Sequence, residues 1–203
     1  MLEQTDSKYG IPVTYECNWD CPYCITDTHS KERTFDEALL IAQEIPNWSK
    51  VTLSGGEPGL LETNQLLEII GILRDKGCSV SISSNGEIFK HPSVMDEISH
   101  VSYHCSTNME LTDVVNREYP TKTVYKVVAT DNNIANLKPF LDKHSDLSIY
   151  VYAAEKVRVK GRVGESLSTK NALMIAVKHK DRLPDNNLKY LLGSEYQQDI
   201  EIK

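Results

Sequence analysis

The sequence predicts an α/β fold whose core is a parallel sheet. Six short apolar stretches, most of them rich in β-branched and aromatic residues, alternate with longer stretches of helical pattern. Such alternation favours parallel strands joined by right-handed crossovers. Six strand–helix units fall short of the eight that close a complete barrel, so an open partial barrel and a doubly wound sheet both fit. Either arrangement gathers chemistry at the carboxyl ends of the strands.

The strand candidates have the lengths of buried parallel strands. They span residues 11–16, 51–54, 79–83, 101–105, 123–129 and 147–153. The helix candidates span residues 34–45, 63–76, 133–143 and 166–180, with weaker patterns at 91–98 and 109–118. Thr34 and Glu37 have the spacing of a capping box, and Gly77 suits the position just after the second helix.

Length and composition are those of one globular domain, with 203 residues of which 40% are hydrophobic and 25% charged. We expect a single domain over residues 1–203, with a core at about 9–180 and a C-terminal extension at about 181–203. No apolar run reaches the length of a membrane span, and the N-terminus lacks the pattern of a secretory signal. The sequence therefore predicts a cytoplasmic protein.

The charge pattern disfavours a large nucleic-acid interface. The net charge is −7, whereas phosphate binding needs concentrated lysine and arginine. A local exception is the run Lys156, Arg158, Lys160 and Arg162, which is basic at every second position. This run fits either a solvated strand or loop, or an anion site.

The cysteines are clustered. Cys17, Cys21 and Cys24 lie within eight residues, while the other two of the five cysteines, Cys78 and Cys105, are isolated. An odd, clustered count points to metal or redox chemistry rather than to disulfides. Three thiolates can hold three irons of a cubane cluster and leave the fourth iron open to another ligand. The alternative is a structural zinc site, for which His29 would supply the fourth ligand.

A glycine turn follows the second strand candidate. The turn reads Gly55-Gly56-Glu57-Pro58. Glycines at the carboxyl end of a strand allow the backbone to approach a ligand closely, and Pro58 stiffens the exit from the turn. An ordinary structural turn is the alternative. The third strand candidate ends in a similar turn, which contains Ser84 and Asn85.

Polar side chains interrupt the fourth and fifth strand candidates. Alternation in the fourth places Ser102 and His104 on one face, opposite Val101, Tyr103 and Cys105. We expect the apolar set to face helices and the polar set to face a cavity. Lys126 lies in the middle of the fifth strand, where burial of an ammonium is costly unless it is paired. His104 and Lys126 are therefore candidate catalytic residues on the substrate side.

The order of these motifs resembles the signature of the radical S-adenosylmethionine (SAM) superfamily. The resemblance rests on CxxxCxxC after the first strand, an aromatic residue just before the third cysteine, and GGEP after the second strand. It implies a partial (β/α)6 barrel of parallel strands with one 4Fe–4S cluster on Cys17, Cys21 and Cys24, whose open iron chelates SAM. It also implies SAM contacts from Tyr23, Gly55, Gly56, Glu57, Ser84, Asn85 and Ser102.

The resemblance implies reductive cleavage of SAM to methionine and a 5′-deoxyadenosyl radical, which abstracts hydrogen from the substrate. A flavodoxin or ferredoxin would donate the electron. The small size favours a small-molecule or nucleotide-type substrate, and Cys78 and Cys105 are too few to hold an auxiliary cluster such as peptide-modifying subfamilies carry. The alternative is an activase or a modifying enzyme that acts on a protein, peptide or nucleic acid. A non-catalytic zinc or iron–sulfur module is disfavoured, because such a module has no use for GGEP.

We predict that replacing Cys17, Cys21 or Cys24 by Ala abolishes cluster assembly, because each removes one of three thiolate ligands. Cys78→Ala and Cys105→Ala are the matched controls and should keep about four irons per chain. Iron and sulfide analysis after anaerobic reconstitution measures both. Tight, stoichiometric zinc binding without iron uptake would contradict the cluster assignment.

Overall fold

The structure is a computed structural model that describes residues 8–21, 24, 35–105, 117–130, 133–147, 149–153, 158–159 and 162–163. The main sheet has the strand order β1-β2-β3-β4-β5-β6. Its strands are β1 (Lys8–Thr14), β2 (Lys50–Gly55), β3 (Ser79–Ser84), β4 (His100–His104), β5 (Thr123–Ala129) and β6 (Ile149–Ala153). The pairs β1–β2, β2–β3, β3–β4 and β5–β6 are parallel.

The strand order confirms the predicted fold class. A doubly wound sheet reverses its strand order at a switch point, whereas this sheet follows the order of the chain from β1 to β6. Of the two arrangements that the sequence left open, the structure therefore has the order of a partial barrel. All six strand candidates are confirmed, with ends that differ by no more than three residues.

The helices are α1 (Phe35–Glu44), α2 (Thr63–Asp75), α3 (Pro92–Glu97) and α4 (Ile134–Lys143), and two short 3-10 helices are η1 (Pro58–Leu60) and η2 (Glu87–Lys90). They confirm the predicted helices near 34–45, 63–76 and 133–143 and the weaker one at 91–98. Gly77 has φ +72° directly after α2, as predicted for its position. Residues Thr34, Tyr23 and His29, the helix candidate 166–180, most of 109–118 and the extension 181–203 lie outside the described residues.

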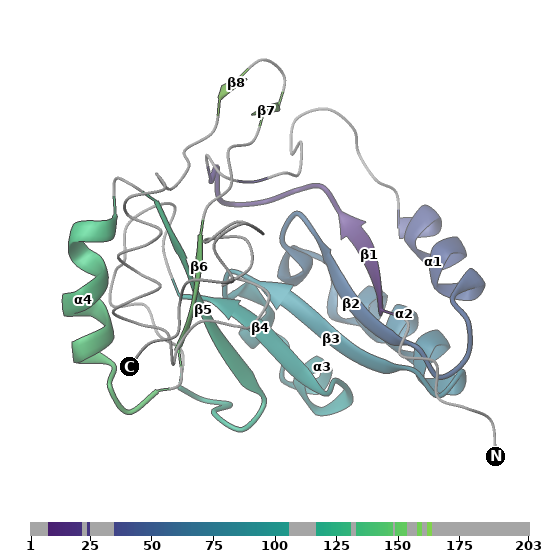
Figure 1. Cartoon of the computed structure of the whole chain (residues 1–203). Helices are drawn as coiled ribbons and strands as arrows, with labels where there is room; N and C mark the ends of the chain where they lie inside the picture. The colour runs from purple at the N-terminus through teal and green to yellow at the C-terminus, as the bar shows by residue number, and fades with distance from the viewer. Residues whose placement is uncertain are drawn as a thin grey trace, which may run out of the picture. The chain divides into compact units, whose positions relative to one another are not determined.

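The described residues belong to two compact units, and the single-domain expectation stays a prediction. The first unit contains β1 to β4 and the helices α1 to α3 (Figure 1). The second contains β6, α4 and residues 125–129 of β5. Cys17 belongs to the first unit, whereas Cys21 and Cys24 belong to the second.

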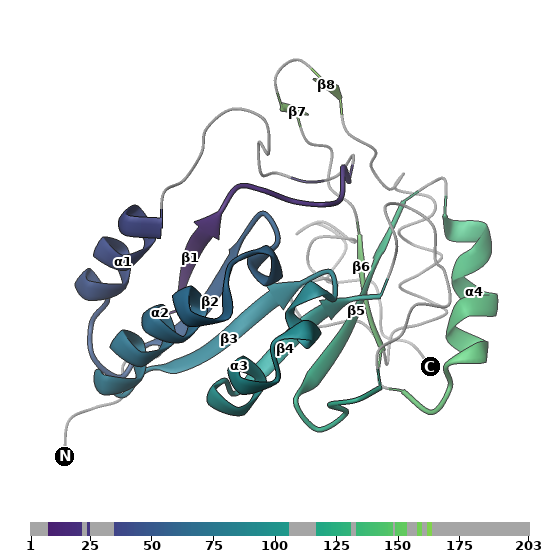
Figure 2. The same cartoon turned by 180° about the vertical axis from the view of Figure 1, so that it is seen from behind.

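In the first unit, helices cover one face of the sheet (Figure 2). On this face Ile11, Leu53 and Ile82 lie in register across three strands, and each of the three is fully buried. In β2 and β3 these apolar residues alternate with polar ones. Helix α2 buries a stripe at helical spacing against it, namely Leu66, Ile69, Ile70 and Leu73. This packing fixes the strands whose carboxyl ends carry the predicted motifs.

The opposite face of β2, β3 and β4 carries polar side chains. Thr52 of β2 lies in register with Ser81 of β3, and their hydroxyl oxygens are 2.9 Å apart. Ser83 of β3 lies in register with Ser102 of β4. The alternation therefore separates a helix-covered apolar face from a face of small hydroxyl side chains.

In the second unit, α4 buries Leu137, Phe140 and Leu141, and Val127 of β5 pairs in register with the fully buried Val151 of β6. Two segments of the basic stretch form a separate antiparallel pair, β7 (Arg158–Val159) with β8 (Arg162–Val163). The role of the stretch, as a solvated strand or loop or as an anion site, stays a prediction.

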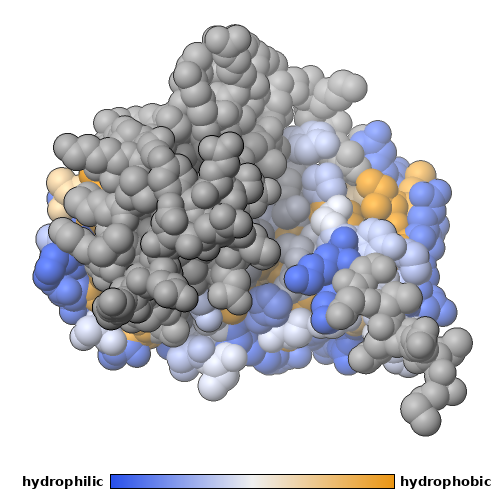
Figure 3. Space-filling view, in the orientation of Figure 1, coloured by the Kyte–Doolittle hydropathy of each residue, from blue (hydrophilic) through white to orange (hydrophobic). Residues whose placement is uncertain are grey.

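The described surface in Figure 3 is largely hydrophilic, with apolar residues in small patches. Among the described residues, the large apolar side chains that are exposed are Leu40, Trp48 and Leu60. None of the helices that the structure describes has the length and apolar character needed to cross a membrane.

Candidate active site

The glycine turn after β2 is bound to the segment that leads from β1 to Cys17. The N–H of Gly56 donates to the carbonyl of Thr14 over 2.6 Å, and the N–H of Glu57 donates to the carbonyl of Glu16 over 2.7 Å. Both N–H groups are thus used within the protein. What the turn can offer a ligand is carbonyl oxygen, which is the type of group that accepts hydrogen bonds from an ammonium.

The two glycines are required by the protein's own backbone. A Cβ on Gly56 would lie 1.9 Å from the carbonyl oxygen of Glu16. Gly55 has φ +111°, and a Cβ there would lie 2.2 Å from the carbonyl oxygen of Thr14. We expected these glycines to make room for a ligand. The structure shows that residues 12–16 lie directly beside them, so close packing of two chain segments is one physical reason for the glycines. Close approach of the turn to a ligand stays a prediction.

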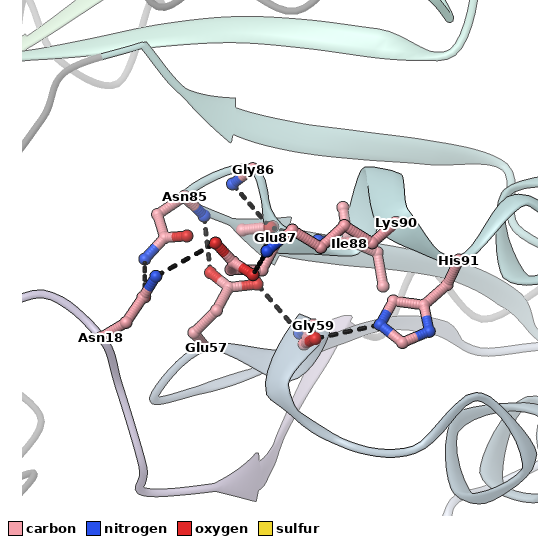
Figure 4. Close-up of polar contacts among 10 residues, drawn as sticks. Asn18, Glu57, Gly59, Asn85, Gly86, Glu87, Ile88, Lys90 and His91 are labelled. Carbon is pink, nitrogen blue, oxygen red and sulfur yellow. Dashed lines mark hydrogen bonds and ion pairs between the residues drawn. The ribbon is translucent and has the colours of Figure 1, made fainter.

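The carboxylate of Glu57 joins the turn after β2 to the turn after β3 (Figure 4). Its Oε1 accepts from the N–H of Gly59 at 2.9 Å and from the hydroxyl of Ser84 at 2.7 Å, and its Oε2 accepts from the N–H of Asn85 at 2.6 Å. Glu57 is only 1% exposed. This burial raises the pKa of the Glu57 carboxyl, an effect that the three donors oppose.

Ser84 is fully engaged inside the protein. Besides donating to Glu57, its oxygen accepts from the N–H of Gly86 at 2.9 Å. Glu57 and Ser84 were predicted as SAM contacts, and the role that their side chains have in the structure is to connect two turns. Their contact with SAM stays a prediction.

Asn85 and Cys17 lie together, although they are 68 residues apart in the sequence. The side-chain Nδ2 of Asn85 lies 3.9 Å from the Cys17 Sγ and donates to Oδ1 of Asn18 at 2.7 Å. The N–H of Trp19 also donates to the Cys17 Sγ, at 3.4 Å. The structure thus brings a predicted cluster ligand and a predicted SAM residue to one place. Two donors aimed at one sulfur suit an electron-rich thiolate, as a cluster ligand is.

The sequence prediction missed Asn18 and Trp19. Both lie between the first two cysteines of the triplet, and their position inside the motif was the signal that could have identified them. Asn18 also donates from Nδ2 to the Glu87 carboxylate at 3.2 Å (Figure 4). Residues within the cysteine loop therefore contact the turn after β3.

None of the five cysteines forms a disulfide in the structure. Cys17, Cys21 and Cys24 are partly exposed, whereas Cys78 and Cys105 are buried. Burial raises the pKa of the Cys105 thiol to about 12, which makes it unreactive. Within the described part of the chain, no three His, Cys, Asp or Glu side chains are grouped to hold a metal ion. Ligation of the cluster by the triplet therefore stays a prediction.

The predicted faces of β4 are confirmed. Val101, Tyr103 and Cys105 are at most 1% exposed on the apolar face. On the other face, the Nε2 of His104 lies 3.4 Å from the Ser83 hydroxyl. Ser102 is in register with Ser83 and is buried.

Lys126 is half-buried in β5, in register with Tyr150 of β6. Burial lowers the pKa of its ammonium group. His104 belongs to the first compact unit and Lys126 to the second. Their predicted roles toward a shared substrate stay predictions.

Comparisons with known proteins agree with these motifs. The model of the Radical SAM superfamily matches residues 11–129. No curated protein sequence matches the chain. Several solved structures match the chain at low sequence identity.

One similar structure is native anSMEcpe with bound AdoMet and the Cp18Cys peptide, with a TM-score of 0.62 and 17% identity over 87% of this chain and 58% of that one. Another is Streptococcus suis SuiB bound to its precursor peptide SuiA, with a TM-score of 0.55 and 13% identity over 89% of this chain and 48% of that one. These likenesses concern the fold. The chain spans less than two thirds of the length of these neighbours.

We predict that Gly56→Ala lowers the free energy of unfolding by about 1–3 kcal/mol, the usual cost of overpacking. It should also reduce iron uptake, because the displaced segment 14–16 leads directly to Cys17. Gly71→Ala is the matched control. Gly71 lies within α2 with nothing within 4 Å of an added Cβ, so this change should stabilise by about 0.5–1 kcal/mol. Urea unfolding and iron analysis measure both, and wild-type values for Gly56→Ala would refute the packing argument.

Proposed function

Because the chain belongs to the radical SAM superfamily, we propose that it is an enzyme that modifies a peptide or protein by radical chemistry. Members of this family use a 4Fe–4S cluster and SAM, which together supply a 5′-deoxyadenosyl radical when bound. The proposal of a peptide substrate goes beyond what family membership implies. We propose it in place of the small-molecule substrate that the sequence analysis favoured.

The structural neighbours support a peptide. Two of these structures contain bound peptides, Cp18Cys for anSMEcpe and SuiA for SuiB. The preference for a small molecule rested on the small size of the chain and on its having too few cysteines outside the triplet for an auxiliary cluster. The argument from size loses its weight because the chain spans 58% of anSMEcpe and 48% of SuiB. The cysteine count argues only against a peptide-modifying enzyme that carries a further cluster in this part of the chain.

The polar face of the first unit also supports a peptide. Towards the carboxyl ends of β2 to β4 it carries hydroxyl and imidazole groups from Ser54, Ser83, Ser102 and His104. Such groups both donate and accept hydrogen bonds, as the amides of a peptide backbone require. Phosphate-bearing substrates would instead favour arginine or lysine at the same positions.

The proposed role of this protein's residues is to bind SAM and the substrate and to orient them for reaction. The carbonyl groups of the turn that follows β2 would accept from the SAM amino group, and Tyr23 would lie beside the adenine. His104 and Lys126 would bind polar groups of the substrate and hold one of its C–H bonds within reach of the radical. An enclosed site would keep the reactive species from side reactions.

We also propose a flavodoxin or ferredoxin as the electron donor and the cytoplasm as the location. Three partly exposed free thiols are compatible with a reducing compartment, where such thiols persist. Reductive cleavage of SAM consumes one electron, which such a donor protein would supply.

We expect randomised peptides, but not a panel of nucleosides, nucleotides and small metabolites, to stimulate formation of 5′-deoxyadenosine by the reconstituted, reduced protein. A stimulating peptide should change in mass, and its deuterated form should transfer deuterium into 5′-deoxyadenosine. Liquid chromatography with mass spectrometry measures all three. Stimulation by a small metabolite and by none of the peptides would contradict the proposal.

Two variants test the substrate side of the same assay. His104→Ala and Lys126→Met should keep the iron content and SAM affinity but lose at least about tenfold of the peptide-dependent rate, since each removes a polar contact worth about 1.5 kcal/mol or more. The control is Lys138→Met on the exposed surface of α4, which should leave the rate unchanged. Normal turnover of the first two variants would remove these residues from the site.

A further inference from the structure

We propose that Asn85 is a positioning residue that raises the reduction potential of the cluster through a hydrogen bond to the sulfur of Cys17. The proposal rests on the predicted ligation of the cluster by Cys17 and not on the identity of the substrate. It is carried by a series of side-chain contacts within the first unit. Hydrogen bonds run from Glu87 through Asn18 to Asn85 (Figure 4), and the Asn85 side chain in turn faces the Cys17 sulfur.

The chain of hydrogen bonds fixes which end of each amide faces which neighbour. Ionised Glu87 can only accept, so the side chain of Asn18 presents its Nδ2 to Glu87, at 3.2 Å. The other end of that amide, Oδ1, therefore faces Asn85 and can only accept. Glu87 also forms an ion pair with Lys90.

Asn85 is thereby held with its NH₂ group towards Asn18 and Cys17. This NH₂ group can donate two hydrogens, and two acceptors lie near it, namely Asn18 Oδ1 at 2.7 Å and Cys17 Sγ at 3.9 Å. The Oδ1 of Asn85 is buried and has no hydrogen-bond partner among the described residues. The hydrogen bond of its nitrogen thus sets the orientation of the Asn85 amide. If this amide were flipped, its Oδ1 would lie against the Oδ1 of Asn18.

The backbone of Asn85 is held independently of its side chain. Its N–H donates to Oε2 of Glu57 at 2.6 Å, and Glu57 also binds Ser84 and Gly59. Truncation of the Asn85 side chain leaves these contacts in place. The side chain can therefore be tested without removing the link between the two turns.

A donor that faces a ligating sulfur stabilises the electron-rich state of a cluster. A 4Fe–4S cluster held by the triplet would be reduced by one electron, from the 2+ to the 1+ state, at the expense of the donor protein. The added negative charge is shared with the sulfurs, so an N–H···S contact favours the reduced form and raises the potential. Trp19 supplies a second such contact from its backbone, at 3.4 Å, which no side-chain substitution removes.

The test is an anaerobic redox titration monitored by electron paramagnetic resonance, without substrate or SAM. In Asn85→Ala the equilibrium constant for one-electron reduction should fall by about threefold to tenfold, where tenfold corresponds to about 59 mV. The iron content should equal that of the wild type. Asn136→Ala, a matched change at an exposed position of α4, should leave the potential unchanged.

Asn18→Ala tests the hydrogen bonds that orient the side chain of Asn85. It removes the acceptor that fixes the amide but leaves Asn85 in place, so the potential should move in the same direction by a smaller amount. A wild-type potential in Asn85→Ala with full iron content overturns the proposal. If Asn85→Ala fails to assemble a cluster, a wild-type potential in Asn18→Ala overturns it. Because no substrate is present, either failure is distinct from failure of the peptide proposal.

Discussion

The site depends on one buried carboxylate, that of Glu57. Burial of an ionised carboxylate is costly unless donors compensate for the lost water. Here three donors do so, one from its own turn at Gly59 and two from the turn after β3 at Ser84 and Asn85. The carboxyl ends of β2 and β3 are therefore tied together by the same hydrogen bonds that stabilise Glu57. The N–H of Asn85 is the donor to Oε2, whereas Oε1 has two donors, so loss of the Asn85 contact would leave a buried oxygen without these hydrogen bonds.

Close backbone packing extends this connection to the cysteine loop. Gly55 and Gly56 allow residues 14–16 to lie directly against the turn, and two backbone hydrogen bonds hold them there. Cys17 is the next residue after this segment. Asn85, whose backbone N–H binds Glu57, contacts the Cys17 sulfur with its side chain. The GGEP turn thus serves the protein's own packing in addition to the SAM binding that its family implies.

The fold was largely predictable from the sequence. Strand candidates were visible because β-branched residues and period-two alternation are local signals, and Gly77 marked the end of α2 through its need for a positive φ. The sequence could not choose between a partial barrel and a doubly wound sheet, because strand order depends on long-range pairing. The face assignments of Ser102 and His104 followed from alternation alone.

The candidate site was predictable as a set of motifs but not as a set of contacts. Cys17, Glu57 and Asn85 were all identified, yet nothing local indicates that the Glu57 side chain would bind the turn after β3 rather than a ligand. Asn18 was missed because its partners, Glu87 and Asn85, are almost 70 residues away in the sequence. Contacts of this kind arise only when parallel strands bring their carboxyl ends to one edge.

The central claim is that this chain binds a redox-active cluster and uses it to cleave SAM. The most direct measurement is the product analysis of the anaerobically reconstituted protein after reduction in the presence of SAM. Our account predicts 5′-deoxyadenosine and methionine in equal amounts, and neither product from the Cys17→Ala variant. A fully loaded, reduced protein that binds SAM but forms neither product under any substrate condition would contradict it.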